Sequence, residues 1–502
     1  WRTWADMVDN FQAKALNTRL RVPLLYGVDA VHGHNNVLGA TIFPHHVGLG
    51  AAGDATLVEA IAAAVAKEVA ATGVRWTFAP AVTVCLDPRW GRCYESYGAN
   101  PGLVTELAIA EIRGWMKVPP EAGNFPGNVF MAPTAKHYVG DGGTRGGVDR
   151  GETVGGEAEL RKVHLLPYVA AVAEGVSTIM ASYSSWNGTK MHGNGRAAQA
   201  GSSAMWAAWC LTGRQTQILR TPTRFTTLSP SIPPLVTLHP SPPLSTPAPP
   251  PPSSYLLTDV LRKELGFVGL MVYLLTDVLR KELGFTGLMV SDWEALKELP
   301  GSYEDQVALG VALGVALVAG RAASLTYIGY PPEDDRYENG TRKRPLEATR
   351  EAAAAWAKRA RSVEADLGII VVGEPPYAEY KGDDQQLELS GPARSTIFGI
   401  CGRIPCVVVV VSGRPLNVTG MLPHLDALIA AWLPGSEGGG VADVLFDEVV
   451  DFKGKLPLPW FRSVRDLQPD HSWPNPPLFP MGFGLSKAGE LIGNRVGGEG
   501  PP

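Results

Sequence analysis

The chain has 502 residues, 45% of them hydrophobic and 19% charged, so it can bury large cores and is predicted to form two or more domains. The formal net charge of −5 argues against nucleic acid and anionic membranes as partners, and the apolar runs are too short for a membrane span. Cys85 and Cys93 form one close pair, Cys401 and Cys406 form another, and Cys210 stands alone. Two close pairs favour two disulfide bonds and a secretory route; four buried thiols in a cytosolic enzyme are the alternative.

The first part of the chain, residues 21–195, alternates strand-like runs with helix-like stretches. Apolar runs at 22–29, 75–82 and 177–183 predict strands, and the Ala-rich stretch 54–73, which ends in a glycine, predicts a helix. Alternation of strands and helices over this length is typical of a parallel α/β architecture.

Polar side chains directly follow several of the predicted strands. They are Asp29, Lys136, His137, Tyr183 and Asp292. In a (β/α)8 barrel the active site gathers at the C-terminal ends of the strands. Several such residues at strand ends therefore predict a site of that kind.

Two unusual stretches precede Asp292. Residues 196–254 are rich in Pro, Ser and Thr and predict a disordered insertion. Residues 256–272 and 274–290 carry almost the same string, which predicts a helix stopped by a glycine and then a buried strand. Only the second copy continues into Ser-Asp-Trp, so we expect it to occupy the barrel and 255–273 to be a duplicated helix–strand segment.

The last part of the chain predicts a second α/β domain at 322–486 and a disordered tail at 487–502. The domain has a mostly parallel sheet, because an Ala-rich helix and other connecting sequence separate its strand-like runs. The runs are 324–330, 367–374 and 406–415, and the helix is 348–360.

Six long motifs, in the right order, resemble glycoside hydrolase family 3 and, within it, the plant and algal exo-β-glucan glucohydrolase and β-glucosidase branch. They lie at 26–51, 86–98, 135–144, 181–193, 284–294 and 430–446. The resemblance covers most of the chain outside 196–273. It implies a (β/α)8-type (TIM-like) barrel, here incomplete, from residues 1–195 and 274–312. An α/β sandwich would follow, with the active site at the interface.

The resemblance also implies two catalytic carboxyl groups. Asp292 matches the family's nucleophile, which forms the glycosyl-enzyme ester. Glu437, in PGSEGGG, matches the general acid/base of this branch, and its glycine neighbours suit a tight loop. In a retaining mechanism the two groups stand ~5–5.5 Å apart. Glu374, after a strand-like run, is the alternative acid/base.

The family's glucose-binding residues match five polar side chains of this chain, and two apolar side chains would supply walls for the sugar. The five are Asp29, Arg92, Lys136, His137 and Tyr183, and the two are Met180 and Trp293. The His residues lack the spacing of metal ligands, so no metal and no cofactor is expected. The stretch 141–151 lacks the Asp-Ser-His of the family's N-acetylglucosaminidases, which argues against an aminosugar substrate.

The chain departs from the family at several points, and we expect a truncated, mis-assembled chain that is poorly folded or inactive as written. The family's first barrel strand and its connection between the two domains, which carries a second sugar-clamping Trp, have no counterpart. Arg150 stands where the plant enzymes have a subsite Glu, and Glu298 where they have an Arg. A barrel that lacks strands exposes sheet edges.

The sequence therefore predicts a retaining, exo-acting β-D-glucosidase that releases glucose from β-glucans or β-glucosides. The alternatives are a β-xylosidase and, from another class, a non-catalytic carbohydrate-binding remnant or defective gene product. The expected location is secreted, extracellular or at the cell wall, with the signal peptide outside this chain. Three Asn-x-Thr sequons, at Asn187, Asn339 and Asn417, are compatible with secretion.

Overall fold

The computed structural model describes residues 2–117, 131–192, 278–292 except 281, 286 and 291, the short strands at 315–316, 337–338 and 341–342, and 367–492 except 437 and 448. The chain divides into two units, residues 1–194 with 270–502, and residues 195–269. All described residues belong to the first unit. The proline-rich stretch, the first copy of the repeat, and the strand and helix predicted at 324–330 and 348–360 lie outside the described residues.

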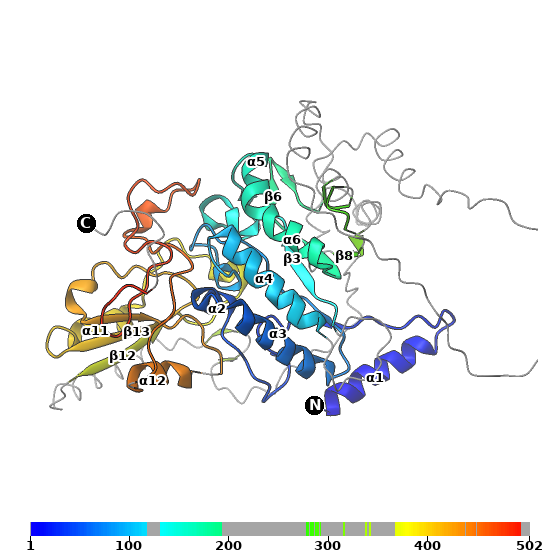
Figure 1. The fold of residues 1–502 in the computed structure, drawn as a ribbon, viewed down its shortest axis with the longest axis horizontal. Helices are drawn as coiled ribbons and strands as arrows, with labels where there is room; N and C mark the ends of the chain where they lie inside the picture. The colour runs from blue at the N-terminus through cyan, green and yellow to red at the C-terminus, as the bar shows by residue number, and fades with distance from the viewer. Residues whose placement is uncertain are drawn as a thin grey trace, which may run out of the picture. The chain divides into compact units, whose positions relative to one another are not determined.

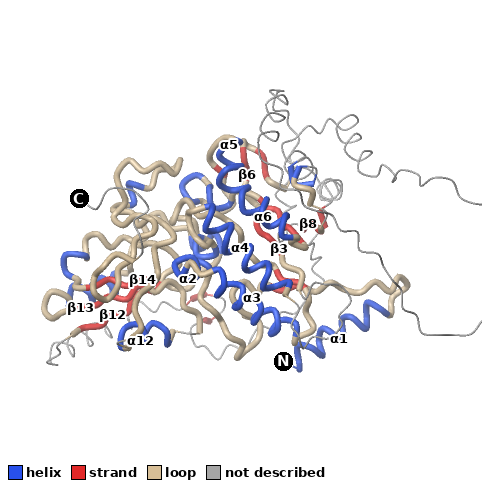
Figure 2. Tube along the Cα trace, in the orientation of Figure 1, coloured by secondary structure: helices blue, strands red, loops and turns tan. Residues whose placement is uncertain are grey.

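The strands of the two main N-terminal sheets pair in parallel, and Figures 1 and 2 show where they lie. Two single bridges, Trp76–Ala132 and Ala81–Lys136, connect the strand at 76–77 and the residues after it to the strand at 134–138 and the residues before it. The described strands do not close into a barrel. In chain order the strands that lie along this path are β1 (Gly27–Val28), β2 (Trp76–Thr77), β3 (Thr134–Tyr138), β5 (Thr178–Ala181), β8 (Leu288–Val290) and β9 (Val315–Ala316).

The strands β3 and β5 are buried at every position, although β3 includes the polar residues Thr134, Lys136 and His137. Side chains on one face, such as Ile179, join the large core beneath the helices. On the other face Met180 packs with Trp76 and Val290 in a small apolar cluster. A covered sheet of this kind holds its strand ends rigidly.

Three helices cover the outer face of these strands: α3 (Ala55–Ala70), α4 (Pro101–Met116) and α6 (Leu166–Glu174). The helices α3 and α4 pack side by side, as do α4 and α6 (Figure 1). Asp54 caps α3 through the N–H of Leu57, as expected for a helix that begins after an Asp. Two further helices, α1 (Arg2–Leu16) and α2 (His46–Ala52), come before α3 in the chain.

The loops after β3 and after β5 together form a small three-stranded sheet. Its strands are β4 (Glu152–Thr153), β6 (Ser185–Trp186) and β7 (Thr189–Lys190). The last two form a hairpin whose turn residues Asn187 and Gly188 both have positive φ, 50° and 73°. An Asn-Gly turn suits such a hairpin because both residues tolerate the left-handed region.

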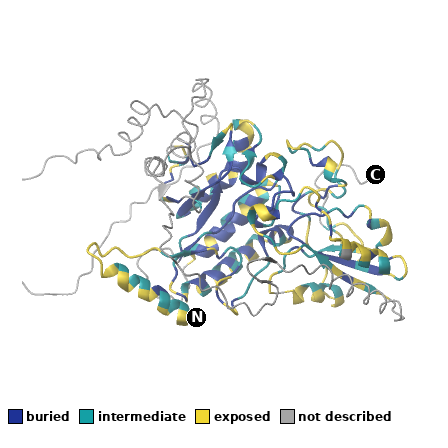
Figure 3. Cartoon of the chain, turned by 180° about the vertical axis from the view of Figure 1, so that it is seen from behind, coloured by how far each residue is buried: buried dark blue, intermediate teal, exposed yellow. Residues whose placement is uncertain are grey.

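The C-terminal region contains a parallel sheet in the order β12 (Gly368–Gly373), β13 (Cys406–Val411) and β14 (Ala427–Ala430). The central strand β13 is mostly buried, whereas β12 exposes alternate residues (Figure 3). Val371 of β12 is one of these exposed residues. The helices α11 (Gly391–Ile400) and α12 (Gly439–Phe446) belong to this region. A short antiparallel pair, β10 (Tyr337–Glu338) and β11 (Thr341–Arg342), is also described.

One hydrophobic core contains side chains from both regions. Val47 and Trp90 of the N-terminal region pack in the same cluster as Val408 and Trp460 of the C-terminal region. The two expected disulfide bonds, Cys85–Cys93 and Cys401–Cys406, are formed, and both belong to this core. None of the helices in the described residues is long and apolar enough to cross a membrane.

Candidate active site

Asp292 lies two residues after β8, at the edge where its neighbours β5 and β3 also end. Its backbone N–H donates to Nε2 of His192 at 3.3 Å. Its Oδ2 lies 3.6 Å from Nε2 of His137, and its side chain is 16% exposed. The carboxylate is therefore held at the strand end but stays accessible.

His137 lies in β3 beside two other charged groups. Its Nδ1 lies 2.7 Å from Oδ2 of Asp141, and its Nε2 lies 3.2 Å from a guanidinium nitrogen of Arg92. A proton on Nδ1 suits both contacts, since Nδ1 then donates to the carboxylate and Nε2 accepts from Arg92. Asp141 thereby fixes the ring orientation of His137.

Arg92 is buried and forms two hydrogen bonds to the carboxylate of Glu95, at 2.7 and 2.8 Å. Burial alone would lower the pKa of Arg92, but the negative charges of Glu95 and Asp292 raise it well above its usual range. Burial alone would raise the pKa of Glu95, but Arg92 holds it well below its usual range. The pair is a fixed, charged group beside the nucleophile candidate.

Lys136 joins the site to β1. Its Nζ lies 2.9 Å from Oδ1 of Asp29, which directly follows that strand. The lysine side chain is 4% exposed and that of Asp29 is 61% exposed. The structure thus brings five of the predicted site residues together at neighbouring strand ends and loops. They are Asp29, Lys136, His137, Arg92 and Asp292.

Tyr183 and Met180 come from the end of β5. Met180 is buried in the cluster with Trp76 and Val290. The guanidinium of Arg150 lies 4.0 Å from the centre of the Tyr183 ring, so one face of this ring is already covered. Lys190 of the hairpin donates to the carbonyl oxygens of both Tyr183 and Arg150, at 2.9 and 3.2 Å.

Two of the predicted site residues, Trp293 and Glu437, lie outside the described residues. The described neighbours of Glu437 are anchored on the N-terminal region. The N–H of Ser436 donates to the carbonyl oxygen of Ile42 at 2.8 Å, and the N–H of Ile42 donates to the Ser436 hydroxyl at 3.0 Å. A Cβ on Gly435 would come within 2.1 Å of the Ile42 oxygen, so this contact requires a glycine.

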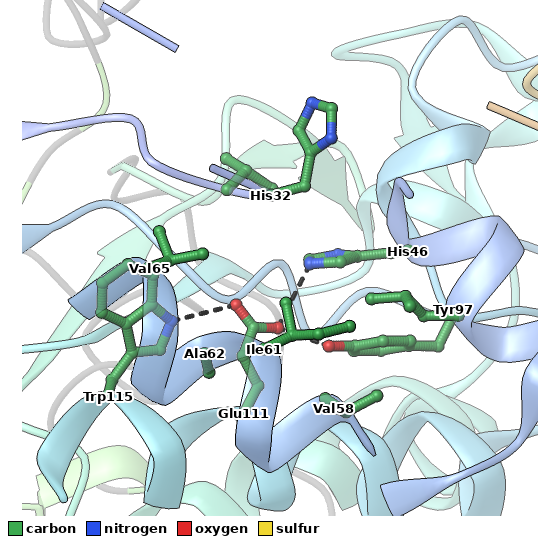
Figure 4. A pocket seen from close by; sticks show the side chains of 11 residues that line it. His32, His46, Val58, Ile61, Ala62, Val65, Tyr97, Glu111 and Trp115 are labelled. Carbon is green, nitrogen blue, oxygen red and sulfur yellow. Dashed lines mark hydrogen bonds and ion pairs between the residues drawn. The ribbon is translucent and has the colours of Figure 1, made fainter. Parts of the chain in front are cut away.

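A small pocket lined by His46 and Glu111 is linked to the Arg92–Glu95 pair (Figure 4). His46 connects the two, since its Nδ1 lies 2.7 Å from the carbonyl oxygen of Glu95 and its Nε2 lies 3.2 Å from the Glu111 carboxylate. Glu111 also accepts from the Tyr97 hydroxyl and from the Trp115 indole. Burial alone would lower the pKa of His46, but Glu111 raises it above its ordinary value. This network supports the loop that carries Arg92.

The family models match the chain in two places. A model of the glycosyl hydrolase family 3 N-terminal domain matches residues 1–199, and one of the family 3 C-terminal domain matches residues 155–487, more than half of the chain. The chain belongs to glycosyl hydrolase family 3. This confirms the fold class predicted from the sequence, an incomplete (β/α)8-type barrel followed by an α/β sandwich.

Family 3 proteins also dominate the individual similarities. The chain is 34% identical over 199 residues to a lysosomal beta glucosidase of Dictyostelium discoideum, covering 38% of this chain and 23% of that protein. It is 35% identical over 184 residues to a beta-xylosidase of Formosa agariphila, covering 36% and 25%. The chain thus spans about a quarter of the length of these curated relatives.

Among solved structures, the chain is similar to a mutant of the exo-1,3/1,4-beta-glucanase ExoP from a Pseudoalteromonas species. The TM-score is 0.68 at 28% sequence identity, and the match covers 100% of this chain and 88% of that one. This similarity extends over both regions, whereas the two curated relatives match over about 200 residues.

Glu374, the alternative acid/base, is part of an ion pair in this family 3 chain. Its carboxylate binds the guanidinium of Arg414 at 2.9 Å and accepts from the Tyr377 hydroxyl at 3.0 Å. Arg414 reaches on to the carbonyl oxygens of Pro88 and Arg89, each at 3.4 Å. The carboxylate of Glu374 thus serves to link the C-terminal region to the loop at 88–89 through Arg414.

Several residues of the site were not predicted from the sequence. Asp141, Glu95 and His192 hold His137, Arg92 and Asp292, respectively. Asp141 lies four residues after His137, and Glu95 lies three residues after Arg92, so both spacings were available in the sequence. His192 gave no such signal, because it lies 100 residues from Asp292. The described residues contain no group of three or more His, Cys, Asp and Glu that could hold a metal ion.

Proposed function

We propose that this chain carries the site of a retaining, exo-acting β-D-glucosidase. The observation that carries the proposal is the position of Asp292 at a strand end, next to His137 and in the electrostatic reach of Arg92. Family membership supports a glycoside hydrolase, and the relatives named as glucosidases and as an exo-β-glucanase support β-glucosides as substrates.

In this proposal Asp292 attacks the anomeric carbon and forms the glycosyl-enzyme ester, while the glycosidic C–O bond breaks. Glu437 donates its proton to the departing oxygen and then takes a proton from the water that hydrolyses the ester. The anchoring of Ser436 on Ile42 supports a fixed loop for Glu437. The two carboxyl groups are expected ~5–5.5 Å apart.

Binding of the non-reducing glucosyl unit is assigned to the polar residues around Asp292. Lys136 and Arg92 present donors of fixed geometry, because each is buried and paired. His137 lies between Arg92 and Asp292 and is held in place by Asp141. Asp29 can accept from sugar hydroxyls, since its side chain is largely exposed. Trp293 and Met180 are assigned to the apolar faces of the sugar.

The test of the proposal is hydrolysis of an aryl β-glucoside by the full chain and by Asp292→Gly. Loss of the nucleophile should lower kcat on the order of 10⁴-fold. Added azide should restore turnover of an activated substrate and yield the α-glucosyl azide, because azide replaces the missing carboxylate on the same face. Asp9→Asn, an exposed acid on α1, is the control and should match the wild type. Wild-type activity in Asp292→Gly would refute the assignment.

Glu437→Ala provides the complementary test. With the nucleophile intact, azide attacks the glycosyl-enzyme ester and should give the β-glucosyl azide, with retained configuration. If Glu374→Ala behaves in this way and Glu437→Ala does not, the acid/base role belongs to Glu374. Equal effects of both variants without any azide product would contradict both assignments.

A β-xylosidase is the second candidate, and the similarity to the Formosa agariphila beta-xylosidase favours it. The two sugars differ by the hydroxymethyl group at C5, so the ratio of kcat/KM for matched aryl glucosides and xylosides decides between them. Sugar binding without turnover by the wild-type chain would instead select a non-catalytic remnant.

We also propose a secretory route for the native protein, supported by the two disulfide bonds. Titration of the unfolded, unreduced protein should detect a single free thiol, that of Cys210. Five free thiols in protein isolated from its native source would contradict this route.

A further inference from the structure

A segment of the C-terminal region, residues 379–385, lies against two loops of the N-terminal region. The carboxylate of Glu379 binds the Arg150 guanidinium at 2.9 Å, and the side-chain amide of Gln385 donates to the carbonyl oxygen of Gly146 at 3.1 Å. We call these residues the 379–385 segment. Its partners lie in the loops 89–95 and 146–150.

Asp383 holds both loops at once. Its Oδ1 accepts from the backbone N–H of Gly91 at 2.8 Å, and its Oδ2 accepts from the backbone N–H of Asp149, also at 2.8 Å. Each oxygen of one carboxylate thus fixes a different loop. Hydrogen bonds from backbone N–H groups to a charged, half-buried acceptor are stronger than neutral ones.

The backbones in this region touch directly, without side chains between them. A Cβ on Gly91 would lie 2.2 Å from the carbonyl oxygen of Glu379 and 2.7 Å from the backbone nitrogen of Asp383. A Cβ on Gly382 would lie 2.9 Å from Cα of Gly91. Glycines at both positions therefore allow the approach that Asp383 needs to reach both N–H groups.

The two loops carry residues of the proposed sugar site at the next position. Gly91 precedes Arg92, which binds His137 beside Asp292. Asp149 precedes Arg150, whose guanidinium covers Tyr183. A shift of either loop would therefore move a charged group at the site.

We propose that Asp383 is a positioning residue for sugar binding, through which the C-terminal region fixes the Arg92 and Arg150 loops around the site. The inference rests on the proposed function of that site. Asp383 touches the backbone of both loops and has no chemical role in the reaction. The effect expected on its loss is weaker binding of the sugar in ground state and transition state alike, which raises KM and leaves kcat nearly unchanged.

The test compares Asp383→Asn with Asp384→Asn in the full chain. The Asn amide places an NH2 group against one backbone N–H, so one of the two hydrogen bonds is lost. The Asp384 carboxylate accepts from the N–H of Gln386, two residues further along the chain, which makes Asp384 a matched control. We expect KM for an aryl β-glucoside to rise about tenfold in Asp383→Asn, with kcat changed less than about twofold, and no change in Asp384→Asn.

Hydrogen exchange provides a readout that does not depend on activity. Peptides that contain residues 89–95 and 146–152 should exchange faster in Asp383→Asn than in the wild type or Asp384→Asn. Faster exchange with unchanged KM would overturn the positioning role, as would equal effects of the two variants. A wild-type chain that neither hydrolyses aryl β-glucosides nor binds gluconolactone refutes the proposed function, and the inference falls with it.

Glu379→Gln keeps the test decisive if Asp383→Asn does not fold. This variant removes the charge that pairs with the Arg150 guanidinium but leaves both Asp383 hydrogen bonds in place. We expect a smaller rise in KM, about two- to threefold, because only one of the two loops is affected. An unchanged KM in Glu379→Gln, together with an unfolded Asp383→Asn, would assign the segment to stability alone and overturn the proposal.

Discussion

The two parallel sheets of this chain differ in how they are covered. In the N-terminal region β3 and β5 have no exposed position, because α4 and α6 pack on one face and an apolar cluster fills the other. In the C-terminal region β12 leaves Val371 65% exposed, and α12 has no buried residue (Figure 3). The catalytic candidate and its polar neighbours gather at the ends of β3, β5 and the strands beside them.

The two regions differ in the same way in how they fix the side chains of the site. Buried polar groups are stable only when they are paired, so Lys136, His137 and Arg92 each have a carboxylate partner. Those pairs fix the geometry of the site from within the N-terminal region. The C-terminal region contributes the 379–385 segment, which binds the loops 89–95 and 146–150 beside the site.

The largest expected contrast is in stability. Ile179→Ala in β5 should lower the free energy of unfolding by about 2–5 kcal/mol, because it leaves a cavity in the large core. Val371→Ala in β12 should cost less than about 0.5 kcal/mol, because its side chain is already in water. Urea denaturation of the two variants measures both values. A large cost at Val371 would show that another part of the chain covers β12.

A pH-dependent contrast comes from His164, which is buried next to the loop of Asp141. Burial, and then the positive charge of His471, lower the pKa of His164 to about 4 from 6.5. Between these values the unfolded chain binds a proton that the folded chain does not. The free energy of unfolding should therefore have its full value above pH 6.5. It should fall by about 3 kcal/mol towards pH 4, because the unfolded chain is then favoured by binding the proton.

His164→Gln should remove this part of the pH dependence. The measurement is the free energy of unfolding at about pH 7 and about pH 4.5, and only the difference between the two counts. His424→Gln, at an exposed histidine of the C-terminal region, should keep the wild-type difference. An unchanged difference in His164→Gln would mean that other groups cause the loss at low pH.

A smaller contrast, in activity, separates the acids Asp141 and Glu374. Asp141→Asn removes the charge that orients His137 and should lower kcat/KM about 10- to 100-fold. Glu374→Gln weakens the ion pair with Arg414, so it should lower the unfolding temperature but change kcat less than about threefold. Steady-state kinetics below the unfolding temperature of both variants decides. A larger kinetic loss in Glu374→Gln would reverse the roles of the two acids.

Some elements were predicted well because their signals are local. The helix predicted at 54–73 is α3, from Ala55 to Ala70, with Asp54 as its cap. The strand predicted at 406–415 is β13, from Cys406 to Val411. The strand predicted at 22–29 was too long, since only Gly27 and Val28 pair with β2. The apolar residues before them are exposed, and apolar composition alone does not provide a pairing partner.

The sequence by itself determined the parallel α/β class, the family, and the strand-end positions of Asp29, His137 and Asp292, since these depend on periodicity and on contiguous motifs. Only the tertiary structure decided which partners those residues have. Glu374 pairs with Arg414, 40 residues further along the chain. Asp383 binds Gly91 and Asp149 from 292 and 234 residues away. Such contacts depend on how distant segments pack, and no local spacing encodes them.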